Sequence, residues 1–238
     1  MNEKENIAEK GPNILQEKEP SSLKLIVALG IAGFFSGLVL VGVYLYTLPM
    51  IEANKAEALQ RAIFKVIPNC ASFKTMELKD GMLIEIEQKT EKKKKRDGGT
   101  KSKKIFAGFN SNDEFVGFAI PGSEPGFQDI IGAIFGYDAS RKVIIGFEVL
   151  ESKETPGLGD KIFKDADFLA NFTSLAINPK IIPVKKGKKQ NPNEVETITG
   201  ATISSKAVIR LLNKTIMGWR TPIEDYITTN NIKLAKKE

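Results

Sequence analysis

Histidine is absent from this chain of 238 residues, and cysteine occurs once, at Cys70. Without histidine the chain has no His-based catalytic triad, no imidazole proton shuttle and no His-ligated metal or haem. A single cysteine excludes an internal disulfide, a Cys-x-x-Cys redox pair and an iron–sulfur cluster held by four cysteines of this chain. The sequence therefore predicts no metal site, and any electron carried here requires an organic cofactor.

The chain also lacks the sequence pattern of a nucleic-acid-binding surface. The formal net charge is +6, but much of the excess comes from Lys-Lys-Lys-Lys-Arg at residues 92–96, with Lys101, Lys103 and Lys104 nearby. No aromatic residues alternate with this run to stack on bases, and no recognition motif follows it. A local run of this kind is typical of a solvated loop, so we expect a loop at 92–104 and no nucleic-acid partner.

Charge is missing altogether from residues 25–45, an apolar run with one serine. An apolar helix needs about 20 residues to cross the ~30 Å hydrocarbon core, so the sequence predicts a transmembrane helix at 25–46. A cleaved signal peptide is the alternative, but the run is long for one and no small-x-small cleavage site follows promptly. Residues 1–24 are polar and are predicted to form a disordered tail.

The charges that flank this apolar run are nearly balanced on its two sides. The positive-inside rule therefore does not orient the predicted span. Three basic residues precede it and three follow at similar distances: Lys10, Lys18 and Lys24, then Lys55, Arg61 and Lys65.

Residues 47–220 carry the periodicities of one folded α+β domain. Apolar residues at helical spacing predict an amphipathic helix over 50–66, which restarts after a break at Pro49 and stops before Pro68. A second long helix follows residue 203, a short one covers 165–172, and the polar tail at 221–238 is helical or frayed. Strands are predicted at 81–87, 105–109, 115–120, 130–137, 143–150, 181–184 and 195–198. This order predicts a mostly antiparallel sheet with flanking helices. Without a Gly-x-Gly-x-x-Gly motif, it does not predict a Rossmann dinucleotide site.

The segment Thr-Gly-Ala-Thr-Ile-Ser-Ser, residues 199–205, directly precedes an amphipathic helical pattern. Its small and hydroxylated residues suit a loop whose backbone N–H groups face an anion, with the helix dipole adding positive potential. Lys206 supplies a positive charge in the first turn. The alternative is an ordinary N-cap, in which Thr202, Ser204 or Ser205 satisfies free N–H groups.

A second unusual stretch is Glu-Thr-Pro-Gly-Leu-Gly-Asp-Lys, residues 154–161, after the predicted strand 143–150. Pro156 fixes one backbone angle, and Gly157 and Gly159 allow close approach by a ligand. The alternative is a β-turn that leads to the next element.

Together and in this order, the two stretches resemble the FMN-binding domain of the RnfG and NqrC subunits. These belong to the Rnf and the sodium-pumping NADH:quinone reductase complexes. The resemblance runs from about residue 25 to about residue 219 and includes the anchor, the 49–68 helix and both motifs. The stretch Asp-Phe-Leu-Ala-Asn-Phe at 167–172 is similar to one common in RnfG, which favours that subunit.

The resemblance implies that Thr202 carries FMN through a phosphoester bond. A separate flavin transferase, which uses FAD and a metal ion, attaches it in the family. The usual Asp six residues before the modified Thr is Glu196 in this chain. Many relatives have Gly-Tyr-Gly-Gly-Pro-Ile where this chain has Gly-Phe-Gln-Asp-Ile-Ile at 126–131. Ten further residues are expected to contact or cradle the cofactor: Glu154, Thr155, Gly157, Leu158, Gly159, Thr199, Gly200, Ala201, Ser204 and Lys206.

The function implied is that of a membrane-anchored electron carrier, a subunit of an ion-translocating Rnf-type oxidoreductase. Its partners would be the other complex subunits, the transferase and the lipid bilayer, and it would not turn over substrate alone. The resemblance implies a single pass through the bacterial inner membrane with the domain on the periplasmic side. Two alternatives remain open: an NqrC-like subunit or stand-alone outward-facing FMN shuttle, and an anchored binding module without cofactor.

Overall fold

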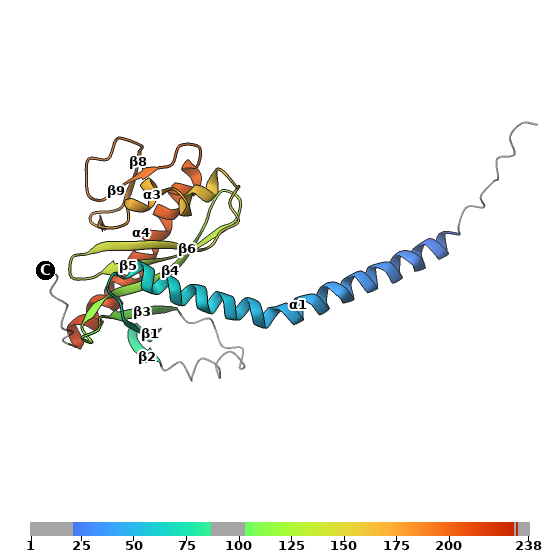
Figure 1. Cartoon of the computed structure of the whole chain (residues 1–238), viewed down its shortest axis with the longest axis horizontal. Helices are drawn as coiled ribbons and strands as arrows, with labels where there is room; N and C mark the ends of the chain where they lie inside the picture. The colour runs from blue at the N-terminus through green and yellow to red at the C-terminus, as the bar shows by residue number, and fades with distance from the viewer. Residues whose placement is uncertain (1–20, 87–102, 231, 233–238) are drawn as a thin grey trace, which may run out of the picture. The chain divides into compact units, whose positions relative to one another are not determined.

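The computed structural model describes residues 21–86, 103–230 and 232 (Figure 1), and the chain divides into two units, residues 1–53 and 54–238. Three sequence predictions lie largely outside these residues. They are the polar tail at 1–24, the Lys-rich loop at 92–104 and the last residues of the 221–238 tail.

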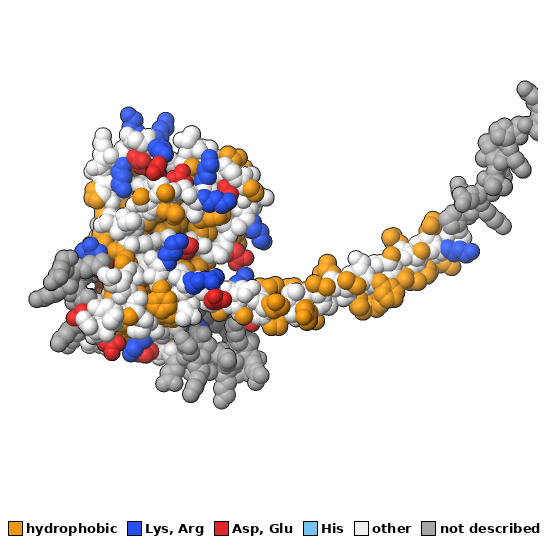
Figure 2. Space-filling view, viewed as in Figure 1, with side chains coloured by type: hydrophobic (Ala, Val, Ile, Leu, Met, Phe, Trp, Pro, Cys, Tyr) orange, Lys and Arg blue, Asp and Glu red, His pale blue; other side chains and the backbone are white. Residues whose placement is uncertain are grey.

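Helix α1 (Ser22–Val66) contains the apolar run, which lies in the first unit. Its most apolar 18-residue window has a mean hydropathy of 2.4, and none of that window is buried. Figure 2 shows hydrophobic side chains along this part of the helix. Among the described residues, α1 is the one helix long and apolar enough to cross a membrane.

The break predicted at Pro49 is absent, because α1 continues through that residue. Proline removes one backbone donor from a helix. In the turn before it, the Thr47 hydroxyl donates to the carbonyl oxygens of Val43 and Tyr44 at 2.9 and 3.2 Å. These bonds add side-chain support to the helix where the proline weakens its hydrogen-bond ladder.

In the second unit, seven described strands form one sheet in the order β2-β1-β3-β4-β5-β6-β7, and every neighbouring pair is antiparallel. The predicted α+β class with a mostly antiparallel sheet is confirmed. The sequence analysis did not predict β1 and β7. The strands are β1 (Ser72–Lys79), β2 (Met82–Ile86), β3 (Lys104–Phe109), β4 (Phe115–Pro125), β5 (Ile130–Asp138), β6 (Val143–Glu151) and β7 (Leu175–Ala176).

A small parallel sheet joins β8 (Ile182–Lys185) to β9 (Glu194–Thr197), with Lys185 opposite Thr197. The 3₁₀ helix η1 (Gly159–Phe163) and helix α3 (Ala166–Ala170) lie between β6 and β7 in sequence. The long helix α4 (Thr202–Thr229) begins before the predicted start near residue 204. It also extends through Pro222 into the predicted tail, where Ile223 is buried.

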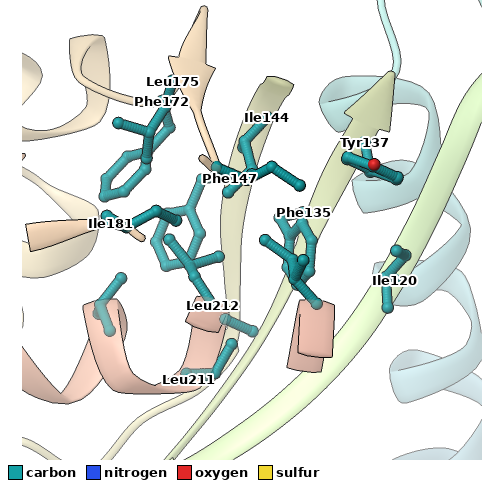
Figure 3. Packing of buried hydrophobic residues seen from close by; sticks show 14 of the residues in the cluster. Ile120, Phe135, Tyr137, Ile144, Phe147, Phe172, Leu175, Ile181, Leu211 and Leu212 are labelled. Atoms are coloured by element: carbon teal, nitrogen blue, oxygen red, sulfur yellow. The ribbon is translucent and has the colours of Figure 1, made fainter. Parts of the chain in front are cut away.

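The larger sheet is covered on both faces, since neighbouring residues of a strand point to opposite sides. On one face, Phe135 belongs to the core cluster that includes Leu211 and Leu212 of α4 (Figure 3). On the other face, Ile134 packs with Ile63 and its neighbours in the last turns of α1. This packing fixes α4 against the sheet, and with it the position of the segment that precedes α4.

Candidate functional site

The two sequence motifs meet at the side chain of Glu154. Ser204 lies fifty residues further along the chain, in the first turn of α4, and its hydroxyl donates to Glu154 Oε2. A Cβ added at Gly159 would lie 2.6 Å from the same carboxylate oxygen and 3.1 Å from Ser204 Oγ. One added at Gly200 would lie 3.6 Å from Leu158 Cδ2. The 154–161 turn therefore packs directly against the 199–205 segment.

A third segment reaches the same carboxylate from the connection between β4 and β5. Glu154 Oε1 accepts the backbone N–H groups of Phe127, Gln128 and Asp129 at 2.9, 3.0 and 3.5 Å. Thr155 Oγ1 adds a bond to Gln128 Oε1 at 2.9 Å. We call this set the Glu154 junction: the Glu154 carboxylate, the N–H groups of 127–129 and the Ser204 hydroxyl.

Glu154 is buried, with 5% of its surface exposed, yet it keeps its charge. Burial by itself raises the pKa of a carboxyl group. The Ser204 hydroxyl and the N–H groups of Gln128, Asp129 and Phe127 outweigh that effect, so the pKa of Glu154 is lowered from its ordinary value. Glu154 was predicted as a cofactor contact, but its carboxylate oxygens are bound by donors of the chain itself.

The Thr-Gly-Ala-Thr segment leaves Thr202 exposed as the first residue of α4. Gly200 has φ +84°, a conformation that costs a residue with a side chain more than it costs glycine. The N-cap is Ala201, which makes no side-chain cap hydrogen bond, so the N–H groups of the first turn have no cap from it. This geometry suits an anion placed at the Thr202 hydroxyl.

The two serines predicted as alternative caps have other roles. Ser204 donates to Glu154, as described above. Ser205 Oγ accepts from the Ile198 N–H at 3.1 Å and donates to the Ala201 carbonyl oxygen at 2.9 Å. Both serines are buried and hold the loop against the helix, whereas Thr202 faces outward.

The other predicted site residues divide by exposure. Ala201 and Gly159 are buried, and Thr155 is half-buried. The exposed members are Thr199, Gly200, Lys206, Gly157 (φ +79°) and Leu158.

Two exposed apolar side chains at this site were missed from the sequence. Phe127 and Ile203 are 67% and 52% exposed, and the predicted Leu158 is 49% exposed. Each one is, or directly precedes, a residue that contacts the Glu154 carboxylate: Phe127 itself, Gly159 after Leu158, and Ser204 after Ile203. A signal was present in the sequence, because an apolar residue beside each motif glycine or serine is unusual in a solvated turn.

A cavity of about 210 Å³ lies on the other side of Thr199, at the carboxyl ends of β8 and β9. Glu196 lines it, and Glu196 Oε1 accepts the N–H groups of Gly187 and Lys189 at 2.9 and 3.4 Å. The residue that the resemblance links to transferase recognition therefore holds the basic loop that follows β8.

The description "FMN-binding domain" belongs to the family whose model matches residues 126–217. The RnfG protein of the Na(+)-translocating ferredoxin:NAD(+) oxidoreductase complex of Acetobacterium woodii is 32% identical over 156 residues, which cover 64% of this chain and 69% of that one. The chain belongs to the RnfG family. The RnfG protein of the ion-translocating oxidoreductase complex of Methanosarcina acetivorans is 25% identical over 193 residues, covering 81% of this chain and 92% of the relative.

Two crystal structures share the fold of this RnfG-family chain. Shewanella oneidensis NqrC matches with a TM-score of 0.58 at 17% identity, over 74% of this chain and 99% of that one. The corresponding protein of the Na(+)-translocating NADH-quinone reductase of Parabacteroides distasonis matches with a TM-score of 0.56 at 20% identity, over 74% and 96%. The resemblance inferred from the two motifs is confirmed, including the preference for RnfG. The protein is a single-pass, membrane-anchored electron-transfer subunit with an FMN-binding domain.

Proposed function

We propose that this RnfG-family protein relays electrons through an FMN joined covalently to Thr202, as part of an Rnf-type ion-translocating complex. The observation that carries the proposal is the exposed Thr202 hydroxyl at the N-terminus of α4, with the 154–161 turn packed beside it. Residues 126–217, which match the FMN-binding family, contain both motifs.

The residues around Thr202 fit the two chemically different parts of FMN. The first-turn N–H groups of α4 and the positive end of its dipole favour a phosphate, and Lys206 adds a mobile charge. The exposed side chains of Phe127, Leu158 and Ile203 offer apolar surface to a flat ring system. FMN supplies the redox chemistry when bound, and the chain binds and orients it.

Attachment requires Thr202 to supply an oxygen atom, since its side chain ends in a hydroxyl. We propose that this oxygen forms the bond to the phosphorus of the FMN half of FAD. The pyrophosphate bond breaks, AMP leaves and the hydroxyl proton is released. A separate flavin transferase with its metal ion catalyses this step, and the segment that carries Glu196 belongs to the surface that it recognises.

We further propose that the domain, residues 47–220, lies outside the cytoplasm on the periplasmic side of the inner membrane. FMN is not resupplied there, so a covalent bond prevents its loss by dissociation. The electron donor and acceptor are then neighbouring membrane proteins of the complex, and α1 holds the domain beside them in the lipid bilayer.

The test is flavin fluorescence of the full-length protein in a denaturing gel, after production together with a flavin transferase. The Thr202→Ala variant lacks the oxygen and should give a dark band. Thr202→Ser keeps the oxygen and should fluoresce at least in part, and Thr199→Ala serves as the matched control that stays bright. A bright Thr202→Ala band would show that the attachment site is elsewhere, and a dark wild-type band would overturn the covalent flavin.

A further inference from the structure

Glu154 contacts three chain segments that are far apart in the sequence. Its Oε1 atom faces the N–H groups of residues 127–129, and its Oε2 atom faces the hydroxyl of Ser204. Glu154 and Ser204 are 5% and 2% exposed, so the junction is shielded from water. In this setting a hydrogen bond to a charged group is stronger than one at the surface.

The junction leaves little freedom for its members to shift. A Cβ at Gly159 would overlap Glu154 Oε2, at 2.6 Å, and one at Gly126 would meet Ile131 Cδ1 at 2.8 Å as well as the Glu154 carboxylate. The three segments therefore approach the carboxylate as closely as their backbones allow. Their spacing is set by this one side chain.

Each of the three segments also presents an exposed apolar side chain beside its contact with the junction. These side chains are Phe127, Leu158 and Ile203, and Ile203 directly follows Thr202. The carboxylate itself points away from them into the packed interior. A group bound at Thr202 would thus meet the apolar side chains and not the charge that holds them.

We propose that Glu154 is a positioning residue for the flavin ring. By holding the three segments at fixed spacing, it sets where Phe127, Leu158 and Ile203 lie around the flavin attached at Thr202. This inference rests on the proposed function, but it assigns Glu154 a different role from the cofactor contact predicted from the sequence.

The chemistry of the junction requires a carboxylate of this length. An ionised carboxylate only accepts hydrogen bonds, and all four partners here donate. A glutamine would direct an NH₂ group at one set of donors, and an aspartate is one methylene too short to span both sets. Both variants keep a side chain in the space and change only the bonds.

The experiment compares full-length Glu154→Gln and Glu154→Asp with the wild type, all loaded with flavin and purified in detergent. The first readout is the fluorescence anisotropy of the bound flavin, which should fall in both variants because the ring gains mobility. The second is the reduction potential of the flavin. It should shift to more positive values in Glu154→Gln, because a negative charge near the ring is lost.

Asp129→Asn is the matched control. It neutralises a carboxylate of the same loop, one that pairs with Lys153 and accepts from the Ile130 N–H, and it leaves the backbone N–H at 129 in place. Its anisotropy should equal that of the wild type. Equal anisotropy and potential in wild type and both Glu154 variants would overturn the positioning role. A wild-type protein without covalent flavin would instead overturn the proposed function.

Ser204→Ala covers the case in which the Glu154 variants do not accumulate, because it removes one donor and keeps the carboxylate. Its flavin anisotropy should also fall, and an unchanged value overturns the proposal. Hydrogen exchange adds a readout without flavin: in the Thr202→Ala background, Glu154→Gln should speed exchange of the 127–129 amides by about tenfold or more. Unchanged exchange would contradict the junction itself.

Discussion

At the scale of single residues, Glu154 and Asp138 are buried acids that keep their charge because donors surround them. Around Asp138 the donors are the Ser140 hydroxyl, the Arg141 side chain and nearby backbone N–H groups. Burial opposes ionisation at both sites, but these donors prevail, and the pKa of each acid is lowered. The folded state therefore binds fewer protons than the unfolded chain in mild acid.

This difference predicts a specific loss of stability in acid. A lowered folded-state pKa gives stability that is complete above the unfolded pKa, near 4.5 for Glu154, and is lost as the pH falls through the folded value. In the flavin-free Thr202→Ala protein, the free energy of unfolding should fall from about pH 5 downward. Adding Glu154→Gln should cost about 1.5–3 kcal/mol at pH 7 and make the acid loss smaller.

Denaturant unfolding in detergent measures these free energies, with the fluorescence of Trp219 as the probe. Trp219 is the one tryptophan of the chain and is 6% exposed in the fold, so unfolding changes its surroundings. If both proteins lose the same free energy between about pH 5 and pH 3.5, Glu154 is not a charged group in the folded state.

The sequence analysis identified both motifs as candidate sites but not the contact that joins them. Thr202 and the 154–161 turn were identified by residue type, order and resemblance. The bonds from residues 127–129 to Glu154 could not be predicted, because backbone donors carry no sequence signal. The departure at 126–131 from the related sequences is visible in the chain, but its meaning comes only from the fold.

At the scale of elements, α4 links the site to the core. The helix begins at Thr202 and buries Leu211 and Leu212 completely against the sheet. Its first turn holds the site, and its apolar face holds the domain together. The position of Thr202 therefore depends on packing several turns away.

Shortening a core residue of α4 should destabilise the whole domain. Leu212→Ala removes a side chain with 0% exposure and should lower the free energy of unfolding by about 2–5 kcal/mol, the usual cost of such a cavity. Met217→Ala, on the same helix but 80% exposed, is the matched control and should change it by less than about 0.5 kcal/mol. Chemical denaturation distinguishes the two, and equal losses would contradict the assigned packing of α4.

Most elements of this domain could be predicted from periodicity, and those that could not have physical reasons. Strand β1 buries three successive residues, Thr75, Met76 and Glu77, so it lacks the alternation that reveals a strand. Strand β7 covers two residues and depends on pairing with β6. The predicted start of α4 is two residues late because its N-cap is Ala201, which is not a typical capping residue.

At the scale of the whole molecule, the length and composition of one helix predicted a single membrane anchor, but the charges around it did not orient it. The lysines and arginines on its two sides nearly balance, so orientation depends on the biology of the cofactor and not on the positive-inside rule. We expect the domain to lie outside the cytoplasm.

Reporter fusions after Glu238 test this orientation. A reporter active only in the periplasm should be active, and one active only in the cytoplasm should not. Paired fusions at residue 24, before the span, provide the internal control and should behave in the opposite way. Activity of the cytoplasmic reporter after Glu238 would contradict the orientation and remove the physical reason for a covalent flavin.

The covalent bond at Thr202 is tested most directly by peptide mass spectrometry on protein purified from its own membrane. Trypsin cuts after Lys189 and Lys206, so one peptide, residues 190–206, contains every hydroxyl side chain of the segment. These are Thr197, Thr199, Thr202, Ser204 and Ser205. Fragment ions should assign an FMN adduct to Thr202 alone. An adduct on any of the other four, or an unmodified peptide, would contradict the attachment site.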